Sequence, residues 1–190
     1  MKRDIILAGV GGQGILSIAA VIGVAAVESG LHLKQAEVHG MSQRGGAVQS
    51  HLRISDQIIS SDLIPQGKCD MILSVEPMEA LRYLHFLAPD AWLITSSKPF
   101  ENIEDYPDPD SLYKEIRMLK NHRIVDAFSI ARELGSQKVS NIVMLGAASA
   151  QLGISTESLE EAIGVLFGRK GEEMVKLNIS ALEAGRNAVY

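Results

Sequence analysis

The feature that most constrains the fold is a short apolar run that ends in a cluster of glycines and leads into a second apolar stretch. Residues 4–8 form the run, which is followed directly by Gly9-Val10-Gly11-Gly12-Gln13-Gly14. An unbroken run of this length is typical of a buried parallel strand, and glycines allow the sharp turn that precedes a helix. We therefore expect a strand, a tight loop and an apolar helix over residues 14–29, with Gly30 as its stop signal.

The same region also has features of a membrane-spanning segment or a signal peptide, because no charged residue occurs between positions 5 and 27. The glycines of the first loop lie in the middle of this stretch, where each costs about 1 kcal/mol in a helix relative to Ala. A strand, a loop and a buried helix explain the stretch better. We therefore expect a cytoplasmic protein without a membrane partner.

The rest of the chain alternates strand-like and helix-like segments up to residue 126 and contains only helices after it. Further strands are expected at residues 33–38, 47–54, 71–75, 91–95 and 123–126. Helices are expected from Pro77 and over residues 111–120, 127–134, 140–152, 156–167 and 172–184, the last four ending at Gly135, Gly153, Gly168 and Gly185. This order predicts an α/β protein with three α/β/α layers, a mainly parallel Rossmann-like sheet and a helical C-terminal region.

One segment breaks the alternation. Residues 47–61 contain two β-rich stretches separated by Ser55 and Asp56, which is the pattern of a hairpin. We expect this hairpin at an edge of the sheet. The acidic segment 101–110, which is broken by prolines, is expected to be a loop inside a single domain that spans residues 1–190.

Charge and cysteine content exclude several classes of function. The formal net charge of −5 argues against a nucleic-acid partner, because binding to phosphates needs clustered Lys and Arg. Cys69 is the one cysteine, so an internal disulfide, a four-thiolate zinc site and a cysteine-ligated iron–sulfur cluster are excluded. We expect no metal in this chain and any electron transfer in another polypeptide.

The first glycine loop matches the G-x-G-x-x-G pattern and lies between a strand and a helix, where the free amides of the helix can receive an anion. Glu37 stands at the end of the second expected strand, where a nicotinamide dinucleotide site needs a carboxylate. The pattern alone leaves three interpretations open: dinucleotide binding, close packing of strand against helix, and binding of another anion.

A second glycine loop follows the second expected strand, with the sequence Gly40-Met41-Ser42-Gln43-Arg44-Gly45-Gly46. Arg44 is a permanent cation with planar donors suited to a carboxylate or a phosphate. If the two loops lie at the carboxyl ends of neighbouring strands, they converge on the crevice where open α/β sheets bind ligands. An ordinary exposed turn with a solvated arginine is the simpler alternative.

Residue types that could carry catalysis lack the spacing they would need. His39 and His51 flank the second loop, but the five histidines show no H-x-x-H or H-E-x-x-H spacing, so ordinary imidazoles are expected. The sequence contains no G-x-S-x-G elbow. Glu76 and Glu79 open a helix, where carboxylates favour the positive end of the dipole. We expect no catalytic residue in this chain alone.

Three segments together resemble the gamma-type subunit or domain of the 2-oxoacid:ferredoxin oxidoreductases, and the likeness covers nearly the whole chain. They are residues 4–14, residues 40–53 and Asn141-Ile142-Val143-Met144-Leu145-Gly146-Ala147. The loop from Met41 to Gly46 and the short final helix within residues 171–190 are most similar to the indolepyruvate-type members of that family.

The resemblance implies that the chain is inactive alone and works with a larger partner subunit. That partner holds thiamine diphosphate, Mg and iron–sulfur clusters, and the complex converts a 2-oxoacid, coenzyme A and oxidised ferredoxin to acyl-CoA, CO2 and reduced ferredoxin. This chain binds none of these cofactors alone and meets ferredoxin only indirectly. Our hypothesis is that both loops contact coenzyme A phosphates or the substrate carboxylate, through Gly9, Gly11, Gly12, Gln13, Gly14, Met41, Ser42, Gln43, Arg44, Gly45 and Gly46.

Other interpretations stay open beside this one. An NAD(P)- or flavin-dependent Rossmann oxidoreductase would use the first loop for the pyrophosphate and Glu37 for the ribose. An adenylating enzyme of the sulfur-carrier-activating type has a similar loop but brings zinc thiolates or a catalytic cysteine. A purely structural assembly subunit would use the apolar helix and the late helices as an interface.

Overall fold

A computed structural model of the chain describes residues 1–40, 45–101 and 103–188 and shows one six-stranded sheet in the order β2-β3-β1-β4-β5-β6. The strands are β1 (Lys2–Val10), β2 (His32–His39), β3 (Ala47–Ser55), β4 (Cys69–Ser74), β5 (Leu87–Ser96) and β6 (His122–Val125). The pairs β1–β4, β4–β5 and β5–β6 are parallel, while β3 is antiparallel to both β1 and β2. The expected α/β fold with a mainly parallel sheet is confirmed.

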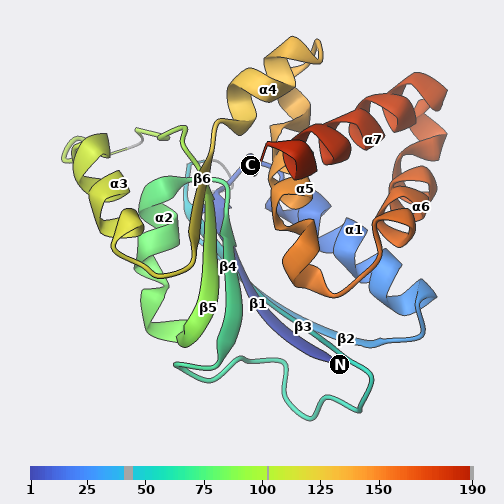
Figure 1. Cartoon of the computed structure of the whole chain (residues 1–190), viewed down its shortest axis with the longest axis horizontal. Coiled ribbons are helices and arrows are strands. Elements are labelled where there is room, and N and C mark those ends of the chain that lie inside the picture. Colours follow the sequence, from blue (N-terminus) through green and yellow to red (C-terminus); the bar gives the residue numbers. More distant parts are fainter. Residues whose placement is uncertain (41–44, 102, 189–190) are drawn as a thin grey trace.

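Helices cover both faces of the sheet, as Figure 1 shows, with α1, α5, α6 and α7 on one side and α2 and α3 on the other. Their bounds are α1 (Ile15–Glu28), α2 (Pro77–Arg82), α3 (Pro109–Arg117), α4 (Ala127–Glu133), α5 (Ser140–Leu152), α6 (Thr156–Phe167) and α7 (Glu172–Asn187). Within the described residues, no helix has the length and apolar character needed to cross a membrane.

The central strand β1 is buried on both faces from Asp4 onward, which explains the apolar run of residues 5–8. Ile5 and Leu7 point into the cluster formed with α1 and the C-terminal helices. Ile6 and Ala8 point into the smaller cluster on the side of α2. A strand covered on both faces favours apolar side chains at consecutive positions, so the run could be recognised without alternation.

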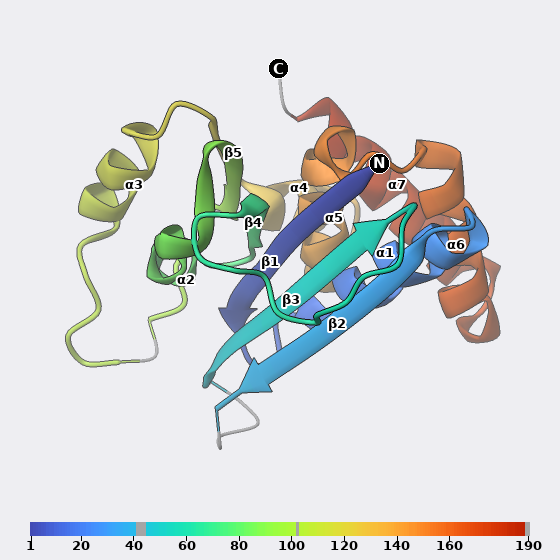
Figure 2. The same cartoon turned by 90° about the horizontal axis from the view of Figure 1, so that it is seen from below.

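The edge hairpin exists, but the expectation that it lies within residues 47–61 is wrong. β3 is one continuous strand that pairs with both β1 and β2, so β2 and β3 form the edge hairpin. Residues 56–68 contain no strand and cross the sheet face opposite to α1 (Figure 2). Arg53 donates from Nη1 to the carbonyl oxygens of Ser61 and Leu63, which holds this crossing segment on the sheet.

Gly185 does not end the last helix, because α7 continues to Asn187. Its role is to let α7 cross α5 closely. A Cβ atom at Gly185 would lie 1.9 Å from the carbonyl oxygen of Val143, and one at Gly146 would lie 2.0 Å from that of Leu182. The two glycines therefore act as spacers between helices, a role that a local sequence pattern does not separate from a stop signal.

Candidate functional site

The two glycine loops meet at the carboxyl end of β1. Val10, the last residue of β1, pairs with Ala47, the first residue of β3. Beyond this pair the Gly11 amide donates to the Gly46 carbonyl oxygen at 2.8 Å, and the Gly45 amide donates to the Gly11 carbonyl oxygen at 3.3 Å. The backbone of the first loop is thus joined directly to the end of the second.

The reason for this convergence differs from the expected one. The second strand, β2, is not the neighbour of β1, because β3 lies between them. Since β3 runs antiparallel to β1, the loop that precedes β3 lies beside the loop that follows β1. Four of the expected site residues, Met41, Ser42, Gln43 and Arg44, lie outside the described residues.

The glycines of the first loop serve different purposes. A Cβ at Gly9 would lie 2.5 Å from Cγ2 of Val75, and one at Gly14 would lie 2.5 Å from Nδ2 of Asn141. Close packing therefore accounts for both. Gly12 has a φ of 99° but, among the described residues, no atom lies within 4 Å of its Cβ position, so its glycine is needed for the turn alone and its outer side is open to that part of the chain.

Gln13 shapes the loop from within. Its side-chain oxygen accepts a hydrogen bond from the Val10 backbone amide at 2.7 Å. The backbone amide of Gln13 donates to the Val10 carbonyl oxygen at 3.1 Å. Asn141, which was not predicted as a site residue, donates from Nδ2 to the Gly14 carbonyl oxygen at 3.0 Å. These contacts fix the start of α1 against α5, so both side chains position the loop.

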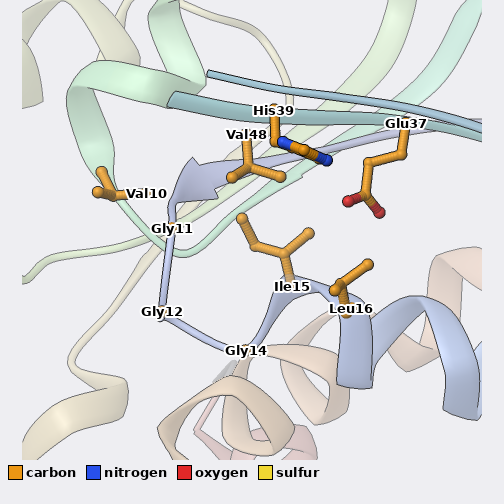
Figure 3. A pocket seen from close by; sticks show the side chains of 9 residues that line it. All are labelled: Val10, Gly11, Gly12, Gly14, Ile15, Leu16, Glu37, His39 and Val48. Atoms are coloured by element: carbon orange, nitrogen blue, oxygen red, sulfur yellow. The ribbon is translucent and has the colours of Figure 1, made fainter. Parts of the chain in front are cut away.

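A cavity of about 380 Å³ lies between the first loop, α1 and the edge hairpin. Figure 3 shows its lining side chains, most of which are aliphatic. They are Val10, Ile15, Leu16, Glu37, His39 and Val48, together with the backbone of Gly11, Gly12 and Gly14. Glu37 and His39 are two residues apart on β2, so they project from the same face of the sheet toward α1.

The cavity has a polar group at each of two sides. Helix α1 has no acidic residue in its first turn and no side-chain cap at Gly14, so its amino end keeps its positive partial charge. The Glu37 carboxylate lies on the β2 side (Figure 3). The shape suits a ligand with an anionic group near the loop and an apolar body along the aliphatic walls.

The acidic pair at the start of α2 stabilises that region of the fold. Glu76 is buried, and its carboxylate accepts hydrogen bonds from the amides of Glu79 and Phe100 and from the hydroxyl of Tyr106. Glu79 is also buried and binds Arg82 through Oε1, whereas its Oε2 has no hydrogen-bond partner in the described part of the chain. Burial raises the pKa of Glu79, and Arg82 opposes this shift only in part.

We expect Glu79→Gln to change how stability depends on pH. An unfolded glutamate ionises near pH ~4.3. Above that pH and up to the higher folded pKa of Glu79, the folded state binds more protons than the unfolded state, so the free energy of unfolding falls as pH rises. Urea denaturation at increasing pH, starting from about pH 4, should show a weaker decline in the variant than in the wild type.

The control for this prediction is Glu133→Gln, which changes an exposed carboxylate at the end of α4. It should leave the pH dependence of unfolding as in the wild type. A Glu79→Gln profile that runs parallel to the wild-type profile would show that Glu79 has the same pKa in the folded and unfolded states.

The other candidate groups have structural roles. Nδ1 of His51 accepts from the Ile64 amide at 3.0 Å, and burial, followed by the charge of Arg53, lowers the pKa of His51. Burial raises the pKa of the Cys69 thiol to about 12. One buried thiol does not fit a thiolate-ligated cluster, and the described part of the chain holds no group of three His, Cys, Asp or Glu side chains that could bind a metal ion.

The fold and the site together define an α/β unit with a Rossmann-like parallel half, an antiparallel edge hairpin and two joined glycine loops beside a ligand-sized cavity. The family described as pyruvate ferredoxin/flavodoxin oxidoreductase matches residues 4–188. The chain belongs to this family and is a subunit of a 2-oxoacid:ferredoxin oxidoreductase.

Three relatives illustrate the match. The chain is 37% identical to the indolepyruvate oxidoreductase subunit IorB of Archaeoglobus fulgidus, over 98% of this chain and 95% of that protein. Its sequence is 27% identical to that of a keto/oxoacid ferredoxin oxidoreductase gamma subunit from Geobacter sulfurreducens. The crystal structure of that subunit matches this one with a TM-score of 0.69 over 98% of both chains.

The third relative shows the fold inside a longer polypeptide. It is the 2-oxoglutarate:ferredoxin oxidoreductase of Magnetococcus marinus, whose structure contains 2-oxoglutarate, coenzyme A and succinyl-CoA. The TM-score is 0.78 at 23% identity, over 99% of this chain but 31% of that chain. The same unit therefore occurs as a separate subunit and as part of a larger chain.

Proposed function

We propose that the chain is the smaller, non-redox subunit of an indolepyruvate-type enzyme that converts a 2-oxoacid, coenzyme A and oxidised ferredoxin to acyl-CoA, CO2 and reduced ferredoxin. The observation that carries this proposal is the hydrogen-bonded junction of the two glycine loops beside the cavity. The similarity to the Archaeoglobus fulgidus subunit supports the indolepyruvate type.

The residues of this chain suit binding and positioning better than redox chemistry. Its single cysteine is buried, and Glu76, Glu79 and His51 are used to hold the fold. We therefore assign thiamine diphosphate, Mg and the iron–sulfur clusters to the larger subunit, where they would supply decarboxylation and electron transfer. The smaller subunit would contribute one wall of the shared active site.

The loops would bind the negative groups of coenzyme A or of the oxoacid. The open side of Gly12 and the amides at the start of α1, which have no side-chain cap among the described residues, offer hydrogen-bond donors to an anion. Arg44 belongs to the loop whose end is bonded to Gly11, so we expect it to add a permanent positive charge to the same site.

Co-expression with the larger subunit tests this assignment. The purified complex should contain iron and thiamine diphosphate and should reduce ferredoxin with indole-3-pyruvate and coenzyme A, while the isolated smaller subunit should do neither. Purification of the smaller subunit alone from such cells, with full oxidoreductase activity, would contradict the proposal.

The strand order argues against the dinucleotide alternative. In a Rossmann domain the acidic strand lies next to the first strand. Here β3 separates them, so β2 lies two strand spacings from β1, about 10 Å. Titration of the isolated subunit with NAD and NADP should show no saturable binding, and binding of either one would favour the alternative.

We expect Arg44→Ala to lower kcat/KM of the assembled complex by about 10-fold to 100-fold, since a charge-assisted hydrogen bond contributes about 1.5–3 kcal/mol. The melting temperature of the subunit should not change. The matched control is Arg169→Ala, which removes an exposed arginine between α6 and α7. Unchanged kinetics in Arg44→Ala, with intact assembly, would favour the purely structural alternative.

A further inference from the structure

The cavity beside the loops has a feature that anion binding does not require, namely a carboxylate set among aliphatic side chains. Ile15 and Leu16 form the α1 side, and Val10 and Val48 line it from the ends of β1 and β3. Glu37 projects from β2 toward these side chains, as Figure 3 shows. Aliphatic walls of this kind suit a flat apolar ring.

Polar residues next to Glu37 on the sheet have other partners, including His39, whose Nδ1 lies 3.4 Å from the Gly40 carbonyl oxygen. Ser50, which is opposite Glu37 in the ladder, accepts a hydrogen bond from Gln35 at 3.1 Å. Lys34 binds Asp62 at 2.9 Å, and it lies three positions from Glu37 and therefore on the other face of β2. Within the part of the chain that the structure describes, Glu37 has no hydrogen-bond or ion-pair partner.

A carboxylate at an apolar cavity, with no partner among the described residues, is matched by a ligand that brings a hydrogen-bond donor on a ring. A carboxylate accepts hydrogen bonds and donates none, so it discriminates for an N–H and against a methylated nitrogen. The anionic end of the same ligand would lie toward the amino end of α1.

We propose that Glu37 is a specificity-determining residue that accepts a hydrogen bond from the indole N–H of the oxoacid substrate. This inference rests on the proposed function, because it takes the oxoacid to be the occupant of the cavity. The adenine ring of coenzyme A also carries N–H donors and an anionic chain, so the experiment must separate the two ligands.

The test uses the complex of both subunits and compares indole-3-pyruvate with 1-methylindole-3-pyruvate and phenylpyruvate. The wild type should prefer indole-3-pyruvate to its N-methyl analogue by about 10-fold or more in kcat/KM. Glu37→Leu should abolish this preference by lowering kcat/KM for indole-3-pyruvate, with little change for phenylpyruvate. Glu37→Gln, whose side-chain oxygen still accepts an N–H, should keep part of the preference.

Glu28→Gln is the matched control, because Glu28 is an exposed carboxylate at the far end of α1 and should leave all three substrates unaffected. An equal loss with all three substrates in Glu37→Leu would overturn the proposal. So would a higher KM for coenzyme A with every oxoacid, since it would place adenine against Glu37. A complex that turns over 2-oxoacids without discriminating the N–H refutes this inference alone, whereas no turnover with any 2-oxoacid refutes the proposed function as well.

Discussion

Gly185→Ala should destabilise the subunit by about 3 kcal/mol or more, because a well-packed helix crossing cannot absorb an added methyl group without moving the backbone. The new Cβ would lie 1.9 Å from the carbonyl oxygen of Val143, and the helices α5 and α7 would have to separate. Gly146→Ala should behave in the same way, since its Cβ would lie 2.0 Å from the carbonyl oxygen of Leu182. Thermal or urea denaturation of the purified variants measures the loss.

Gly164→Ala provides the control within the same helical layer. Gly164 lies inside α6, and no atom of residues 1–40, 45–101 or 103–188 comes within 4 Å of its Cβ position. Replacing it should stabilise the subunit by up to about 1 kcal/mol, because alanine favours the helical backbone. Equal melting temperatures for Gly185→Ala and the wild type would mean that α5 and α7 do not pack as closely as the structure shows.

Asp4→Ala should cost about 3–5 kcal/mol of stability, since it leaves the partly buried guanidinium of Arg53 without its carboxylate. Asp4 is fully buried in β1 and accepts from Nε of Arg53 at 2.7 Å and from Nη2 at 3.1 Å. The same guanidinium holds the segment that crosses the sheet through its bonds to Ser61 and Leu63. The variant should therefore lose both the ion pair and the anchoring of residues 56–68, measured by urea denaturation and by proteolysis.

The control for Asp4→Ala removes the second cation that binds the same carboxylate. Lys2 contacts Asp4 at 2.7 Å, but its side chain is 57% exposed, so Lys2→Ala should cost less than about 1 kcal/mol. A double variant, Asp4→Leu with Arg53→Met, should recover part of the loss by replacing the pair with apolar groups. If Asp4→Ala and Lys2→Ala destabilise the subunit equally, burial of the Asp4–Arg53 pair does not determine the loss of stability.

The element order could be predicted because each element carries its own local pattern. Residues 5–8 of β1 are all apolar since both faces of the strand are covered, and α5 and α6 have the bounds expected from their sequences. The two errors arose where one local pattern serves two structures. Gly185 is a helix spacer with the sequence appearance of a stop, and residues 57–61 are β-rich but lie in a segment that crosses the sheet.

The site could be predicted only in part, because its assembly depends on strand order. Both glycine loops were recognised from composition, and the bonds between Gly11 and Gly46 bring them together as expected. The antiparallel insertion of β3 between β1 and β2 has no local signal, so the cavity that joins Glu37 to Ile15 and Leu16 could not be inferred. Asn141 also has no local signal, because its contact with Gly14 joins residues that are far apart in the sequence.

The register of the ladder between β1 and β3 fixes where the second loop ends. A slip of one residue would turn Arg53 into the helical core and Leu52 out of it, so the alternation of side chains permits only steps of two residues, about 7 Å along the strand. Buried residues far from the loop, which set the strand register, therefore determine where the end of the loop lies. Evolution can then exchange residues between Gly40 and Gly45, and with them the ligand, without changing the strand register that places Gly46 beside Gly11.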